Sequence, residues 1–138
     1  MVGMGYSARD KVTEAAREYN DGVRWGKYDQ AAKHVALDKR KSFLERHKAL
    51  DEELEIADYE MTSIDVDKSN RKQYKSTARM EYTWTLKREG LIKKTTTQQY
   101  WEERDGDWVM AREERIKGAP LTLFDEPPAD KDQASKPN

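Results

Sequence analysis

The chain has no cysteine, no long apolar run and almost no net charge. Without cysteine, disulfides, thiolate metal sites and cysteine nucleophiles are excluded. No stretch approaches the roughly 18 apolar residues that a transmembrane helix requires. The 26 basic and 27 acidic side chains are interleaved and leave a net charge of −1, which provides no long-range field to attract nucleic acid. We therefore expect no transmembrane segment and no nucleic-acid partner.

A mean hydropathy of −1.14 and 38% charged residues are close to the composition of disordered chains. Four Trp and seven Tyr argue for a folded domain, because they can seal a small core. The aromatic residues stop at Trp108 apart from Phe124, and four prolines follow Gly118. We expect a flexible leader over residues 1–6, one domain over residues 7–117 and a disordered tail over residues 118–138.

Helical periodicity occupies the first 50 residues. Ser7 and Asp10 have the spacing of a capping box before an apolar stripe that reaches Val23. A second, short helix is expected from Tyr28. A third is expected after Asp38 as its cap, with a buried stripe formed by Phe43, Leu44, His47 and Leu50.

From Leu54 the apolar period changes to two. The parity slips twice between Leu54 and Val66, which predicts bulges or a sharp bend in that strand. Residues 77–86 alternate cleanly between polar and apolar, as in a strand with one buried face. Turns at 88–90 and at Asp105-Gly106 predict two more strands. The fold class is therefore α+β, with three N-terminal helices followed by four antiparallel strands.

Two segments resemble the nuclear-transport-factor-2-like superfamily. Tyr19 to Ala32 has an amphipathic helix that ends near an aromatic residue and a glycine, followed by a helix of the form x-Tyr-x-x-Ala-Ala. Trp101-Glu-Glu-Arg-Asp-Gly-Asp-Trp108 resembles the last hairpin of that superfamily. The likeness covers residues 7–117. It implies a cone, in which the helices pack on a strongly bent antiparallel sheet and leave a pocket between them.

Members of the superfamily include enzymes and non-catalytic modules, so the fold leaves function open. We expect a non-catalytic binding or assembly module, with an apolar cone pocket or a protein interface on the sheet face. The alternative is a small-molecule isomerase or dehydratase with a carboxylate in the cone, for which Asp58 and Tyr19 are the acid and hydrogen-bond donor to consider. A carboxylate or histidine at the bottom of the cone would favour the enzyme, and a filled or apolar cone the module.

Aromatic residues are the main candidates for a ligand pocket, although the same side chains can equally form the core. Tyr100 and Trp101 compete for the inward face of their strand. The candidates are Tyr19, Trp25, Tyr59, Met80, Tyr82, Trp84, Tyr100, Trp101 and Trp108. The expected partner is accordingly a protein or a small apolar ligand.

Other motifs carry little chemistry. His34 and His47 are the only histidines and fall on different expected helices, so we expect no metal and no cofactor. The basic residues 39–41 are interpreted as a solvated helix face. The polar run Thr95–Gln99 is interpreted as an exposed stretch of the convex sheet face or as a homodimer interface through the sheet.

The first residues leave the cellular location open. Met1 to Gly5 are small and featureless, which fits either a natural start or a chain trimmed after a removed signal. The absence of cysteine would follow if a lipid-bearing cysteine had been removed with that signal. Many bacterial members of the resembling superfamily are envelope proteins. A tethered location in the cell envelope or periplasm is therefore favoured slightly over the cytoplasm.

Overall fold

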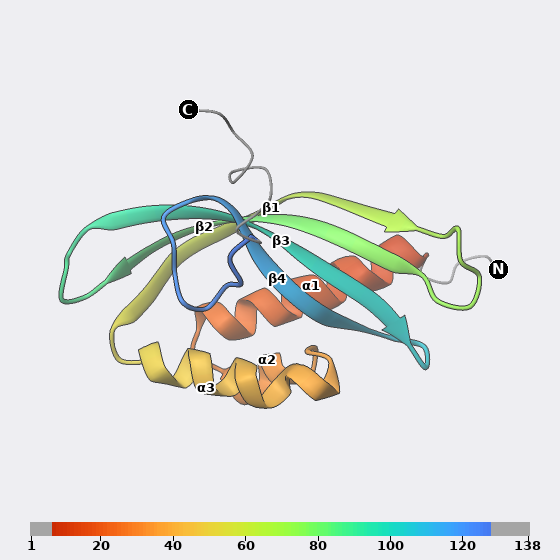
Figure 1. Cartoon of the computed structure of the whole chain (residues 1–138), viewed down its shortest axis with the longest axis horizontal. Coiled ribbons are helices and arrows are strands. Elements are labelled where there is room, and N and C mark those ends of the chain that lie inside the picture. The colour runs from red at the N-terminus through yellow and green to blue at the C-terminus, as the bar shows by residue number, and fades with distance from the viewer. Residues whose placement is uncertain (1–6, 128–138) are drawn as a thin grey trace, which may run out of the picture.

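The computed structural model describes residues 7–127, in which four helical segments precede a four-stranded sheet (Figure 1). The expected order of three α-helices and four strands is confirmed, with a short 3₁₀ turn added before the third helix. The elements are α1 (Ala8–Arg24), α2 (Tyr28–Ala32), η1 (Leu37–Lys39), α3 (Arg40–Leu50), β1 (Leu54–Asp67), β2 (Lys75–Leu86), β3 (Ile92–Arg104) and β4 (Asp107–Gly118).

The predicted capping box begins α1. The Asp10 amide donates to Ser7 Oγ over 3.1 Å, and the Ser7 amide donates to the Asp10 carboxylate over 3.3 Å. Close packing of α2 requires glycine at position 22 of this helix, because Ala31 Cβ lies 3.0 Å from where a Gly22 Cβ would be. The expected cap of α3 was wrong. Asp38 belongs to η1, and α3 follows Lys39 without a side-chain cap.

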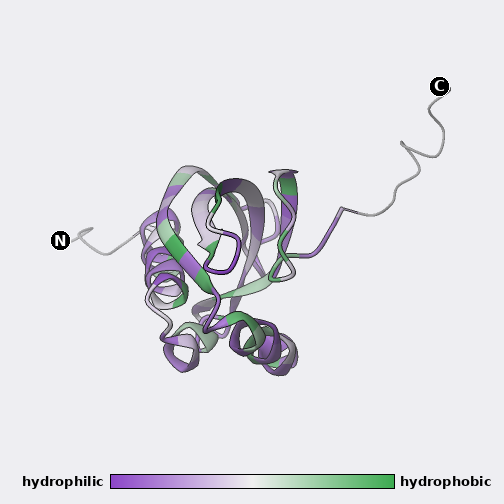
Figure 2. Ribbon diagram, turned by 90° about the vertical axis from the view of Figure 1, so that its left-hand side faces the viewer, coloured by the Kyte–Doolittle hydropathy of each residue, from purple (hydrophilic) through white to green (hydrophobic). Residues whose placement is uncertain are grey.

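The four strands form an antiparallel meander in the order β1-β2-β3-β4. The two slips predicted in the first strand are confirmed as register shifts, between Ile56 and Asp58 and between Met61 and Ser63. These irregularities bend the sheet, and α1 crosses its concave side with α2 and α3 next to it (Figure 1). The side view shows how strongly the strands curl (Figure 2).

The concave face of the sheet carries the core. Met80, Tyr82 and Trp84 of β2 are all buried, as the alternation predicts. Trp101 is buried and Tyr100 is only partly buried, which decides the inward parity of β3 in favour of Trp101.

The interpretation of Thr95–Gln99 as an exposed stretch was wrong. Thr95, Thr97 and Gln99 are buried and lie across from the inward residues of β2, with Thr95 paired to Tyr82. Their polar groups are satisfied inside the cone, where Thr95 Oγ1 accepts from Trp84 Nε1 over 2.8 Å. Hydrogen bonding therefore compensates for burying side chains that hydropathy places outside.

Residues 119–126, the C-terminal segment, pack onto the domain. Leu121, Leu123 and Phe124 are buried, and the Phe124 ring stacks on Tyr82 with centroids 5.3 Å apart. Asp125 forms a parallel bridge with Glu114. The packed chain thus extends past the expected boundary at residue 117. The expected leader (1–6) and residues 128–138 of the expected tail lie outside the described residues.

Candidate functional site

A cavity of about 270 Å³ opens between η1, α3, β4 and the C-terminal segment. Its inner wall consists of buried side chains, namely Tyr19, Val35, Phe43, His47, Met110, Glu113 and Leu123. Its rim consists of Asp38, Lys39, Ser42, Arg46, Ala111, Arg112 and Asp125. The loop after α2 fixes one side, because the Ala36 amide donates to the Met110 carbonyl over 2.9 Å and the Met110 amide to the His34 carbonyl over 2.7 Å.

Glu113 is the only charged side chain among the buried residues of that wall, with 7% of its surface exposed. Three donors converge on one of its oxygens, Oε2. They are Thr97 Oγ1 at 2.6 Å, Tyr82 Oη at 2.7 Å and Gln99 Nε2 at 3.1 Å. The other oxygen, Oε1, accepts no hydrogen bond of ordinary geometry within residues 7–127. The fully buried side-chain atoms without a hydrogen-bond partner in that range are Arg24 Nε and Trp108 Nε1. Glu113 Oε1 is not one of them, so it is accessible from the cavity.

The network around Glu113 supports two proton arrangements. The Tyr82 hydroxyl lies 2.7 Å from both Glu113 Oε2 and Asn20 Oδ1, and its single hydrogen donates to one of them at a time. With Glu113 ionised, Tyr82 donates to the carboxylate. With Glu113 protonated on Oε2, the acid donates to Tyr82, which donates to Asn20. Burial raises the pKa of Glu113, although the bonds from Thr97, Tyr82 and Gln99 lower it in part.

Tyr19 lies beside this carboxylate on the same wall. Burial, followed by the proximity of the Glu113 carboxylate, raises the pKa of the Tyr19 phenol well above its ordinary value. No hydrogen bond of ordinary geometry joins the two side chains in the described chain. A phenol and a carboxylate oxygen thus face one cavity, and both can contact a polar group that enters it.

His47 is the second titratable group on the wall. Its Nδ1 donates to the Phe43 carbonyl over 2.9 Å, which is the tautomer that a carbonyl partner requires. Its ring lies 4.1 Å from Phe43 and 5.4 Å from Tyr28, measured between centroids. Burial lowers the pKa of His47 to about 4. A neutral imidazole with so low a pKa is a weak base at pH 7.

We expect His47 to make the protein sensitive to acid. The folded-state pKa is about 4 and the ordinary value is 6.5. Between these pH values the unfolded chain binds a proton at His47 that the folded chain does not bind. Stability should therefore fall as the pH drops from about 6.5 to 4, by about 3 kcal/mol in total. His47→Phe keeps an aromatic ring and removes this titration, so the variant should lose less stability across that window. Urea unfolding at several pH values measures the difference.

His34→Gln is the matched control for this experiment. His34 is partly exposed and pairs with Glu18 over 3.2 Å, and this pairing counteracts the lowering of its pKa by burial. Its replacement should change the pH profile much less. Parallel profiles for wild type and His47→Phe would contradict the burial of a neutral His47.

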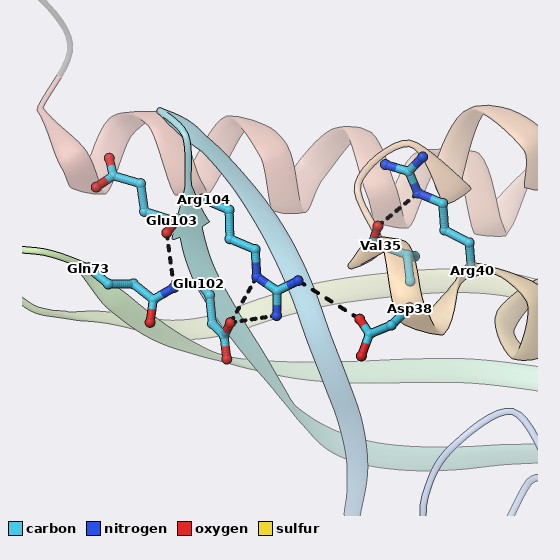
Figure 3. Close-up of polar contacts among 7 residues, drawn as sticks. All are labelled: Val35, Asp38, Arg40, Gln73, Glu102, Glu103 and Arg104. Carbon is cyan, nitrogen blue, oxygen red and sulfur yellow. Dashed lines mark hydrogen bonds and ion pairs between the residues drawn. The ribbon is translucent and has the colours of Figure 1, made fainter.

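The rim of the cavity is tied down by ion pairs. Arg104 on β3 contacts Glu102 over 2.9 Å and reaches Asp38 of η1 over 3.8 Å, so it joins the β3–β4 hairpin to the rim (Figure 3). Arg40 Nε donates to the Val35 carbonyl over 3.0 Å (Figure 3). Arg46 of α3 binds Asp125 over 3.0 Å and thereby fixes the C-terminal segment.

The predicted pocket residues separate into three groups. Tyr19 alone lines the cavity. Met80, Tyr82, Trp84, Trp101 and Trp108 are buried in the core, although Tyr82 reaches the site through its bond to Glu113. Trp25 is 64% exposed at the end of α1 and does not line this cavity. Tyr59 is partly buried and donates to Asp21 over 2.5 Å, and Tyr100 lies on the outward parity of β3.

The sequence-based search missed Glu113 and considered Asp58 instead. Asp58 is 72% exposed and pairs with Arg24, so it does not enter the cone. Trp108 and Met110 face inward, and a strict alternation would place Arg112 inward next. Tyr100 pairs with Arg112 and Trp101 pairs with Met110, so β4 contains one extra residue at this point. This register shift reverses the parity of β4 and turns Glu113 inward in place of Arg112. Nothing in the local composition signals that shift.

Residues 7–127 contain no cluster of three or more His, Asp or Glu side chains arranged to hold a metal ion. In the same part of the chain, every helix is too short or too polar to cross a bilayer.

No protein-family model matches the sequence, and no curated protein matches it either. Several solved structures do match its fold. A putative Ca/calmodulin-dependent kinase II association domain from Exiguobacterium sibiricum superposes with a TM-score of 0.64 and 12% identity, over 86% of this chain and 99% of the other. An NTF2-like protein from Cytophaga hutchinsonii gives 0.62 and 7%, over 80% and 98%.

A third similar structure is a protein of unknown function with a cystatin-like fold from Nostoc punctiforme. Its TM-score is 0.59 at 11% identity, over 85% of this chain and 96% of the other. At such low identities the likeness concerns the fold alone. The chain therefore has the cone-shaped nuclear-transport-factor-2-like, or cystatin-like, fold.

Proposed function

We propose that this domain is a non-catalytic module that binds a small molecule in the cone cavity. The observation that carries the proposal is Glu113, a buried carboxylate with one oxygen held by three donors and the other open to a cavity of about 270 Å³. Convergent polar groups beside apolar side chains in a hollow are typical of ligand sites. The wall is therefore more polar than the apolar pocket expected from the sequence.

Catalysis is the second candidate. A carboxylate whose pKa is raised by burial, with a phenol beside it, is the combination that acid–base enzymes of the isomerase or dehydratase type require. A carboxylate in the cone is the feature expected of an enzyme, so Glu113 favours this alternative. Against it, Glu113 Oε2 is fully engaged and the pKa of His47 lies at about 4, so the site lacks a second group that exchanges protons at neutral pH.

Nuclear magnetic resonance with a library of fragments tests the proposal. Fragments that bind should shift the amide signals of Phe43, Met110 and Glu113 together, because these residues line one cavity. Ser42→Trp is the blocking variant, because Ser42 is an exposed rim residue and a bulky ring there should fill the mouth without disturbing the core. Thr122→Trp, at an exposed position that does not line the cavity, is the control.

Binding that survives Ser42→Trp, or shifts scattered over the whole domain, would overturn the proposed site. The same samples separate binding from catalysis. Exchange of a carbon-bound hydrogen of a fragment with D₂O, lost in Glu113→Gln, would favour the enzyme.

Assembly through the sheet and a tether to the cell envelope stay predictions. The neighbour described as an association domain supports the first.

A further inference from the structure

We propose that the cone cavity binds a small primary amine whose protonated nitrogen lies against Glu113 Oε1, beside the Tyr19 hydroxyl. This inference rests on the proposed function and names its ligand class. Three features of the site lead to it: a buried carboxylate without a cation, a carboxylate oxygen open to the cavity, and apolar side chains beside it.

The first feature is the missing positive charge. Buried carboxylates are normally paired with a cation, because removing an isolated charge from water is costly. All ion pairs within residues 7–127 involve other acids, and Glu113 takes part in none of them. Asp125, the charged residue that acts on Glu113, is itself an acid. An ammonium group in the cavity would supply the charge that this chain leaves out.

The second feature is the chemistry of Oε1. With Glu113 ionised, neither carboxylate oxygen carries a hydrogen. Oε1 is then an acceptor only, and its partner in the cavity must be a donor. An ammonium offers three donors, so it can bind Oε1 and the oxygen of Tyr19 at the same time.

The third feature is the surroundings of the carboxylate. Val35, Phe43, Met110 and Leu123 line the cavity and can pack against an alkyl chain. The cations of the rim are already engaged, because Arg46 binds Asp125 over 3.0 Å and Arg112 binds Glu114 over 2.7 Å. Lys39 adds one further positive charge, and Asp38 on the same rim opposes it. The path to Glu113 is thus close to neutral for an incoming cation.

Titrations with n-butylamine, n-butanol and butyrate test the ligand class, because the three probes share one alkyl chain and differ in charge. They are followed by nuclear magnetic resonance on the full chain at pH 7 and constant ionic strength. We expect butylamine to bind at least tenfold more tightly than butanol and to shift Phe43, Met110 and Glu113. Butyrate should leave these signals unchanged. In Glu113→Gln the advantage of the amine over the alcohol should disappear.

We compare Glu113→Gln with Ser42→Trp, which closes the mouth and leaves the network intact. Should the first variant fail to fold, loss of butylamine binding in the second supports the site and its persistence overturns it. Equal binding of butanol and butylamine to wild type would overturn the amine class while the cavity remains a binding site. No binding of any probe, together with no fragment in the cavity, would overturn the proposed function itself.

Discussion

Replacing Trp84 with alanine is expected to lower the free energy of unfolding by about 3–5 kcal/mol. Trp84 is 1% exposed and lies on the concave face near the end of β2. Its Nε1 donates to Thr95 Oγ1 over 2.8 Å, and that hydroxyl donates in turn to the Ala119 carbonyl over 2.6 Å. The substitution therefore removes a large apolar surface and also one hydrogen bond of a chain that reaches the start of the C-terminal segment. Chemical denaturation measures the loss.

Trp25→Ala is the matched control, because it deletes the same side chain from an exposed position. The Trp25 ring contacts the Arg24 guanidinium over 4.6 Å, and such a contact at an exposed site contributes about 0.5–1 kcal/mol. We expect a change no larger than that. A loss below about 1 kcal/mol for Trp84→Ala would show that the assigned inward face of β2 is wrong.

Phe124→Ala is expected to be nearly as costly, at about 3–4 kcal/mol. Phe124 is buried and its ring stacks on Tyr82 at an interplanar angle of 22°. Since Tyr82 also binds Glu113, the loss of this ring should loosen the wall of the cavity as well as the core. Denaturation curves measure the first effect, and the amide signal of Glu113 reports the second.

A truncation that removes residues 126–138 provides the contrast. Within the described residues it deletes Glu126, whose pair with Arg115 is exposed, and Pro127. Exposed pairs contribute little, so the melting temperature should stay within about two degrees of the intact chain. A large drop on this truncation, or a small one for Phe124→Ala, would contradict the assignment of the anchoring role to Leu121, Leu123 and Phe124.

Features that depend on local pattern could be predicted from the sequence. The two parity slips between Leu54 and Val66 appear as two register shifts of β1. Asp105 and Gly106 both have positive φ, as the tight turn requires. In these places neighbouring residues carry the whole signal, because alternation and turn chemistry act over a few positions.

Features that depend on distant partners could not be predicted from the sequence. Thr97 and Gln99 are polar, and only the position of Glu113 on β4 explains why they are buried. Glu113 itself faces inward because of a register shift whose cause lies in the pairing of two strands. The packing of Phe124 depends on Tyr82, more than 40 positions earlier in the chain. The position of each of these residues is determined by a contact with a residue far away in the sequence, which local periodicity does not reveal.

The core draws side chains from both ends of the described chain, with Val12 near the start and Phe124 near the end. A ribosome releases the N-terminus first, so α1 emerges with an apolar face whose partners have yet to be made. Sheet pairing can begin at the β1–β2 hairpin, but the last core position is filled late. We therefore expect folding during synthesis to finish only once Phe124 has left the ribosome. A nascent chain stopped before that point would keep apolar surface exposed and available to chaperones.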